Sequence, residues 1–172
     1  MLKLMKNDVK AILSKSKLDF DTFIHICDSW GVDPMLAAAI IQVESGGDPN
    51  AMRYEPDYRW TLTPEKYARG LRVTTITELI LQKFSYGLFQ TMGAVCRELG
   101  YEESLPLLLE PLTNTTWGVQ KIAELQGRYK RMTDVISAYN QGSPRKKAHN
   151  VAEYQNQDYV DKVYALYLDM EM

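Results

Sequence analysis

The chain has 172 residues, of which 45% are hydrophobic and 24% charged, and its formal net charge is −2. That length suits one ordinary domain with a sizeable core, and the composition is that of a folded soluble protein rather than a disordered or fibrous one. The near-neutral charge gives no electrostatic basis for binding nucleic acid or for strong adhesion to an anionic cell wall, so no nucleic-acid partner is expected.

The N-terminal stretch, MLKLMKNDVKAILSKSK, is basic, and its apolar residues have the spacing of an amphipathic helix over residues 1–16. It has no continuous apolar core and no small-residue cleavage site, so a secretory signal is not predicted. No stretch approaches the ~20 apolar residues of a membrane span. We expect a protein made in the cytoplasm without a signal peptide and with no membrane span.

The next helix is expected to begin at Asp19 or Asp21 and to end at Gly31. It carries Cys27, and the second of the chain's two cysteines, Cys96, lies in a later apolar pattern. With no CxxC motif and only two histidines, a zinc site is not expected, and we predict no metal and no cofactor. Both cysteines are most simply buried thiols of a protein made in a reducing compartment, and a single bridge between them is the alternative.

Residues 33–50, DPMLAAAIIQVESGGDPN, carry the clearest helix signals in the chain. Asp33 can cap the free N–H groups of the first turn, and Pro34 suits the first helical position. The following alanines and isoleucines favour a helix, and the Gly46-Gly47 pair supplies its end. A helix over residues 33–46 is therefore predicted.

Glu44 lies near the end of this helix and is the main candidate for chemistry. It falls at helical spacing with Ala37, Ile40 and Ile41, so it shares the apolar stripe. Burial and the negative end of the helix dipole both favour the protonated carboxyl, as in a general acid whose pKa is raised from ~4.3. The alternative is a carboxylate at the edge of the stripe, in solvent or paired with an arginine.

Residues 48–62 lose this periodicity and become aromatic and charged. They form a loop or short-strand region, in which a small β-hairpin around residues 50–62 can be accommodated. Tyr54, Tyr58 and Trp60 are candidates for stacking on sugars, and simple packing is the alternative.

The rest of the chain reads as helices joined by short connections. Helices are expected from Thr63 onwards and over residues 75–83, 88–100, 114–131, 133–140 and 158–168, with a proline-punctuated connection at 101–113 and a basic loop at 142–150. The prediction is a mainly α protein with an N-terminal helical extension (residues 1–30) and a single domain (residues 31–172).

Four ordered segments resemble one family, the soluble lytic transglycosylases. VESGGDPNA (residues 43–51) resembles their "ES-G-NP-A" signature, and SYGLFQTM (85–92) their "GLMQIM" turn. ISAYNQG (136–142) resembles their "AYNAG", and Tyr159-Val160 their terminal "YV" helix. The resemblance covers roughly residues 30–168 and implies a lysozyme-like fold of the goose-type lysozyme and lytic transglycosylase kind.

The chain also departs from the family pattern. Phe89 replaces the usual methionine, Gly93 the usual proline and Gln141 the usual alanine. The segment between Ala51 and Gly87 is longer than in short bacterial members, and RYEPDYRW resembles bacteriophage members. A serine that lines the cleft shortly before "GLMQ" in some relatives has no secure counterpart.

By this resemblance Glu44 is the catalytic residue. Gln90 and Met92 match cleft-lining positions, and Gln90 suits hydrogen bonding to an acetamido group; the alternative is a helix-terminal polar residue and a core methionine. Tyr139 and Asn140 match residues beside the catalytic glutamate, where they would hold the carboxyl or contact the substrate. Their alternative is a packed tyrosine and a helix-capping asparagine.

Three further residues complete the set of substrate-binding candidates: Tyr86 and Tyr159, from the matched motifs, and Glu55, from the aromatic stretch that should face the cleft. For Glu55, a salt bridge to Arg53 or Arg59 is an equally good explanation.

The resemblance implies cleavage of the β-1,4 bonds of peptidoglycan, between N-acetylmuramic acid and N-acetylglucosamine. Glu44 would protonate the leaving oxygen and then act as a base on the muramic C6 hydroxyl, giving a 1,6-anhydro ring without consuming water. The first alternative is a muramidase, which would ordinarily need a second carboxylate at ~5–5.5 or ~6.5–9.5 Å. Asp48, Glu55 and Asp57 are the candidates, although Asp48 is better explained as a turn residue.

The second alternative is a non-catalytic virion or cell-wall-binding module. The expected partner is the peptidoglycan glycan strand, bound by a monomer. A protein without a signal would reach the wall after holin-type release, as an endolysin does, or from a phage virion.

Overall fold

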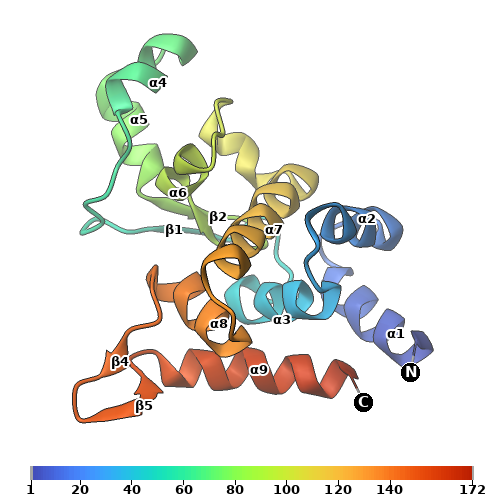
Figure 1. The fold of residues 1–172 in the computed structure, drawn as a ribbon. Helices are drawn as coiled ribbons and strands as arrows, with labels where there is room; N and C mark the ends of the chain where they lie inside the picture. Colours follow the sequence, from blue (N-terminus) through green and yellow to red (C-terminus); the bar gives the residue numbers. More distant parts are fainter. Residues whose placement is uncertain (1, 172) are drawn as a thin grey trace.

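The structure, a computed structural model, describes residues 2–171, with side chains described for residues 7–170. In Figure 1 the three-stranded sheet lies on one side of the helical part, and the two-stranded hairpin lies near the C-terminal helix. In chain order the elements are α1 (Leu2–Leu13), α2 (Phe20–Trp30), α3 (Pro34–Ser45), β1 (Met52–Tyr54), α4 (Pro64–Leu71), α5 (Thr75–Gln82), β2 (Phe84–Tyr86), β3 (Thr91–Met92), α6 (Gly93–Glu98), the 3₁₀ helix η1 (Leu105–Leu109), α7 (Pro111–Arg128), α8 (Met132–Gln141), β4 (Lys146–Lys147), β5 (Asn150–Tyr154) and α9 (Gln157–Glu171).

Helix α3 lies at the centre of the fold. The Asp33 side chain accepts a hydrogen bond from the Met35 N–H at 2.9 Å, and Pro34 occupies the first turn, as predicted. Gly46 ends the helix in the left-handed conformation, with φ of 59°. Six successive residues of α3, from 36 to 41, are fully buried because α9, α1 and α2 all pack against it. Glu44 therefore projects from the end of a helix that is held on several sides.

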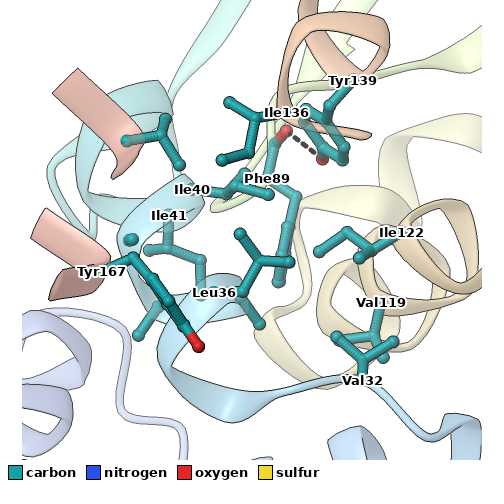
Figure 2. Packing of buried hydrophobic residues seen from close by; sticks show 14 of the residues in the cluster. Val32, Leu36, Ile40, Ile41, Phe89, Val119, Ile122, Ile136, Tyr139 and Tyr167 are labelled. Atoms are coloured by element: carbon teal, nitrogen blue, oxygen red, sulfur yellow. Dashed lines mark hydrogen bonds between the residues drawn. The ribbon is translucent and has the colours of Figure 1, made fainter. Parts of the chain in front are cut away.

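The larger hydrophobic cluster surrounds α3 (Figure 2). Leu36, Ile40 and Ile41 of α3 meet side chains from α7, α8, α9 and the turn after β2. The N-terminal helices belong to the same cluster, through Val9 of α1 and Phe23 of α2. The segment expected to be an N-terminal extension thus packs into the core of the domain.

A smaller cluster lies beneath the sheet and η1. It is formed by Tyr86, Cys96, Tyr101, Leu105 and Leu108. The two cysteines are free thiols in different clusters, so the predicted alternative of a bridge between them is not what the structure has. Burial raises the pKa of both thiols to about 12.

The strand expected within residues 50–62 forms as β1, but its partner is β2, some distance along the chain. Met52 lies opposite Tyr86, and β2 pairs in turn with β3 in an antiparallel sheet of order β1-β2-β3. The predicted hairpin within 50–62 is therefore wrong in its pairing. The tilted contact between the Tyr54 and Phe84 rings, whose centroids are 4.9 Å apart, favours the observed partner.

The helix predicted over residues 88–100 is also shorter than expected, because α6 begins only at Gly93. Gly87 and Gln90 both have positive φ, of 64° and 45°, so the chain turns twice before β3 and cannot be helical there. Helix α7 begins at Pro111 rather than 114 and ends at Arg128 rather than 131. An unpredicted hairpin, β4–β5, begins within the basic loop and extends beyond it to Tyr154.

No single helix in the described part of the chain is long and apolar enough to cross a membrane. Helices α2 and α3 together have the length and composition, but they meet at 114°.

Candidate active site

Glu44 borders a hollow of about 270 Å³ between α3, the three-stranded sheet, α7 and α8. The residues that line it are Glu44, Arg53, Glu55, Tyr58, Ser85, Gln90, Met92, Lys121, Tyr139 and Asn140. Besides Glu44, five of the seven other predicted site residues line this hollow: Glu55, Gln90, Met92, Tyr139 and Asn140. Segments that are far apart in the sequence are thus brought together around one carboxyl group.

The Glu44 carboxyl is partly buried and accepts a hydrogen bond at 2.7 Å from the hydroxyl of Tyr159 on α9. Burial raises the pKa of Glu44, while the Tyr159 hydrogen bond and the positive charges of Lys121 and Arg53 act in the opposite direction. The net shift is upward, which is the direction predicted for a general acid. Tyr159 is not among the residues that line the hollow, and it contacts Glu44 from α9.

Of the other carboxylates considered from the sequence, only Glu55 lines the hollow. It forms an ion pair with Arg53, one of the two partners that the sequence suggested. Asp48 is exposed and accepts a hydrogen bond from the Asn50 N–H at 2.9 Å, as a turn residue does. Asp57 is exposed and lies outside the hollow.

Gln90 is held tightly by the backbone around it. Its amide nitrogen donates to the carbonyl oxygens of Ala51 and Gly87, both at 2.9 Å. Both amide hydrogens are therefore engaged, and the side-chain carbonyl oxygen is the group left to accept from a ligand N–H. This is compatible with recognition of an acetamido group through its N–H rather than its carbonyl.

Met92 and Ser85 lie opposite each other in the β2–β3 pair, and both line the hollow. The Ser85 hydroxyl donates to the Met92 sulfur at 3.2 Å. Sequence reasoning found no secure cleft serine before the turn, because the side of the strand on which Ser85 lies depends on its register with β3. Ser85 is the serine that the fold places there.

Tyr86 is a correction to the predicted site. It is fully buried, and its hydroxyl donates to the Leu81 carbonyl at 2.7 Å, within the smaller cluster. Since neighbouring residues of a strand point to opposite faces, Ser85 faces the hollow and Tyr86 faces away. Tyr86 is thus a core residue and has no route to a substrate.

Tyr139 and Asn140 lie at the end of α8. The Tyr139 hydroxyl donates to the Phe89 carbonyl at 2.8 Å, a contact drawn in Figure 2, so Tyr139 ties α8 to the turn that carries Gln90. Asn140 is exposed, and its side-chain oxygen accepts from Asn156 at 3.1 Å. Tyr139 has a structural role as well as its place in the hollow, whereas Asn140 is open to a ligand.

A second hollow, of about 470 Å³, continues from the first. The two share Tyr58, Met92, Lys121, Tyr139 and Asn140. Trp60, whose side chain is 69% exposed, lines the second hollow and meets Tyr58 edge to face at 5.6 Å. Trp60 is exposed and Tyr58 is half-buried, and both line the cleft, so their rings are placed to stack on sugars. The third candidate, Tyr54, is 45% exposed but lines neither hollow, and its ring contacts Phe84.

Two residues of α7 in or next to the site carried no recognisable signal in the sequence. Lys121 lines both hollows. Asn114 is buried behind the turn, where its side chain bonds to the Phe89 N–H and to the carbonyls of Tyr86 and Leu108, at 2.8 to 2.9 Å. Each is a polar residue on an apolar helix face, and this pattern alone does not indicate which groups the side chain contacts.

The hollows hold a carboxyl with a raised pKa, amide and hydroxyl groups for sugar contacts, and exposed aromatic rings, arranged along an extended cleft. No group of histidine, cysteine, aspartate and glutamate side chains in the described residues is suited to a metal ion. A comparison with curated proteins finds no match. The model of the transglycosylase SLT domain matches residues 21–161, which is most of the chain. The chain therefore belongs to the SLT transglycosylase family, with its lysozyme-like fold, and is an enzyme of the lytic transglycosylase type that degrades peptidoglycan.

Proposed function

We propose that the enzyme cleaves the β-1,4 bond between N-acetylmuramic acid and N-acetylglucosamine and leaves 1,6-anhydromuramic ends. The observation that carries this proposal is the unequal state of the two carboxylates in the hollow. Glu44 is partly buried with a raised pKa, and Glu55 is held in an ion pair by Arg53. One acidic group is thus suited to donate a proton, and the other is already engaged.

The reaction then needs Glu44 in two roles. Its carboxyl proton passes to the glycosidic oxygen as the C1–O bond breaks, and positive charge develops at C1. The substrate's own N-acetyl group stabilises C1 in place of a protein nucleophile. The Glu44 carboxylate then takes the proton from the C6 hydroxyl as that oxygen bonds to C1, so the carboxyl group is restored and no water is consumed.

Tyr159 supports both roles by fixing the orientation of the carboxyl. Its hydroxyl bonds to Oε1 of Glu44 at 2.7 Å, which leaves Oε2 as the oxygen that carries the transferred proton. Tyr58 and Trp60 offer aromatic faces to neighbouring sugars, and Asn140 and the Gln90 carbonyl oxygen offer polar contacts.

The test is mass spectrometry of the soluble fragments released from purified peptidoglycan, with and without borohydride reduction. We expect fragments that resist reduction and weigh one water less than ordinary muropeptides. Reducible fragments of full mass would show that water is the acceptor and would overturn the anhydro product. An inactive Glu44→Gln variant serves as the control for contaminating hydrolases.

A muramidase reaction is the second candidate, and the presence of Glu55 in the same hollow is what favours it. In that case Glu55 would need to leave Arg53 and activate a water or attack C1. A Glu55→Gln variant separates the two reactions. Loss of activity together with reducible products from the wild type would support hydrolysis, whereas unchanged anhydro products would exclude a catalytic role for Glu55.

We also propose that the protein is encoded by a bacteriophage and acts as a monomer. Support for phage origin comes from the longer segment before Gly87 and from RYEPDYRW, which resembles phage members of the family. Such a protein would reach the wall through holin-type release or from the virion. Proteomic detection in purified virions would favour the second route, and detection only in lysates would favour the first.

A further inference from the structure

Lys121 is the only cation, within the described residues, that lines both hollows of the cleft. It lies on α7, facing the end of α8, and its ammonium group donates to the Tyr139 carbonyl at 2.9 Å. The same group sits over the Tyr139 ring, 3.8 Å from the ring centroid. A lysine side chain normally extends its ammonium group into bulk water. The position of the Lys121 ammonium group against the Tyr139 ring therefore calls for an explanation.

Glu44 lines one of these hollows together with Lys121. The two groups form no ion pair among the side chains that the structure describes, yet both line the same hollow and each is affected by the other's charge. Burial lowers the pKa of Lys121, and the negative charge of Glu44 acts against that lowering. A substrate that enters this hollow would therefore meet both an acid and a cation.

We propose that Lys121 is a positioning residue of this active site, which fixes the end of α8 and supplies the positive charge that stabilises the carboxylate form of Glu44. The proposal rests on the proposed function in one respect: the carboxylate exists in the reaction after Glu44 has given its proton to the leaving oxygen. At that moment a nearby positive charge is most favourable. Before the proton is transferred, the Glu44 carboxyl is neutral, and the positive charge of Lys121 stabilises it little.

Other groups around Glu44 share this influence and must be considered with it. They are Tyr159 on α9, Tyr139 on α8, Arg53 on β1 and Glu55 after β1. Lys15, exposed on the loop after α1, donates to the Gly46 carbonyl at 3.2 Å and is not among the charges that act on Glu44. Arg53 is largely exposed and is already paired with Glu55. Of the three cations Lys15, Arg53 and Lys121, only Lys121 is both half-buried and unpaired with a carboxylate, so its charge is screened least.

The test is a direct titration of the Glu44 carboxyl by NMR, with ¹³C-labelled glutamate and the resonance assigned by its absence in Glu44→Gln. Lys121→Met removes the charge and the hydrogen bond, whereas Lys121→Gln removes the charge and keeps a donor for the Tyr139 carbonyl. In both variants we expect the midpoint to rise by about one pH unit. Lys121→Arg should stay close to the wild type.

Lys15→Met is the matched control, because Lys15 also donates to a backbone carbonyl beyond the end of α3 but lies outside the hollow. Its midpoint should equal that of the wild type. Thermal unfolding identifies variants that do not fold, and Lys121→Gln keeps the test valid if Lys121→Met fails. An unchanged midpoint in a folded Lys121→Gln protein would overturn the proposal.

Activity gives the second measurement. If Glu44 must be protonated to act, the alkaline limb of kcat/KM on peptidoglycan should move upward in Lys121→Gln and return in Lys121→Arg. A lysine that only packs would lower the rate without moving that limb. A wild type that releases no fragments would disprove the proposed reaction, and the NMR titration would still report on Lys121.

Discussion

At the scale of single residues, the cleft depends on the proton affinity of one carboxyl. Glu44 has a raised pKa because it is buried, and the groups that oppose this shift come from three other elements. Substituting Glu44→Gln should lower peptidoglycan cleavage by about a hundred- to ten-thousand-fold, the usual contribution of a general acid. Turbidity clearing of cell walls measures the effect, and full activity in a folded variant would remove Glu44 from the mechanism.

The same raised pKa has a consequence for stability. The folded protein binds the Glu44 proton more tightly than the unfolded chain does, so stability falls as the pH rises from the ordinary range of a glutamate through the folded pKa. The Glu44→Gln variant has no carboxyl at this position, so it does not lose stability in this way as the pH rises. We expect its melting temperature to exceed that of the wild type at neutral pH, with the difference vanishing in acid. Calorimetry at both pH values tests the sign, and a constant difference would contradict it.

Tyr159→Phe removes the hydrogen bond that favours the Glu44 carboxylate. The pKa of Glu44 should rise further, so the alkaline limb of kcat/KM should move to higher pH. The freed carboxyl also loses its fixed orientation, and we expect kcat to fall about tenfold, as for a lost hydrogen bond to a charged group. A pH–rate profile of both proteins measures these changes. A lower rate with no movement of the limb would limit Tyr159 to orientation.

At the scale of elements, the turn between β2 and β3 determines how the cleft is lined. Gly87 has φ of 64°, and an added Cβ would lie 2.8 Å from the Asn114 side chain, so the turn and α7 are in close contact. Asn114→Ala would remove a hydrogen bond from each of three backbone groups, the Phe89 N–H and the carbonyls of Tyr86 and Leu108. We expect a loss of about 2–4 kcal/mol in unfolding free energy, since each such group costs about 1–3 kcal/mol and the site can relax.

Asn114→Ala should also weaken activity, because the turn carries Gln90 and leads to Met92. Urea unfolding gives the first effect and fragment release the second. Thr116→Ala on the same helix is a control whose hydroxyl bonds only within α7. Equal stability of the Asn114 variant and the wild type would show that the turn does not need this amide.

The elements also show what could be predicted from the sequence. Local signals were sufficient for α2 and α3, because Asp19, Asp33 and the glycines that end both helices act within one turn. The pairing of β1 with β2 was missed, since the strands lie far apart in the chain and are each only three residues long. Glu44 was found from its position on an apolar stripe.

The surroundings of Glu44 could only be found in part. The hydroxyl that holds it comes from Tyr159, 115 residues away, and was suggested only by the family resemblance. The side on which Ser85 and Tyr86 lie depends on strand register, which the sequence leaves open, and Lys121 has no motif at all. Residues placed by tertiary packing are therefore the ones that sequence reasoning missed.

At the scale of the whole molecule, the cleft lies between the larger cluster around α3 and the region of the smaller cluster. Glu44 and Tyr139 come from the first side, and Ser85 and Met92 from the sheet on the other. The geometry of the site therefore depends on how rigidly the smaller region is built. A fully buried ion pair, Glu78 with Arg97, lies at the centre of that region.

Arg97 joins α6 to α5 and to the connection after α6. Its guanidinium donates to both Glu78 oxygens at 2.9 and 3.1 Å, and to the carbonyls of Tyr101 and Glu103 at 2.7 and 2.8 Å. Arg97→Met would leave the Glu78 carboxylate buried without its partner. We expect a loss of about 3–5 kcal/mol in unfolding free energy, measured by urea denaturation.

The double variant Glu78→Met with Arg97→Met distinguishes two contributions to the unfolding free energy. One is the net stabilisation by the ion pair, and the other is the destabilisation caused by leaving one buried charge unpaired. Because no charge is then left buried, it should recover much of the stability that Arg97→Met loses. If the pair also sets the shape of the cleft, the double variant should remain less active than its stability predicts, since the carbonyls of Tyr101 and Glu103 lose their donor. If the double variant recovers its stability and is fully active, the ion pair is not required for the geometry of the active site. A well-packed core in the smaller region would then be sufficient to position Ser85 and Met92.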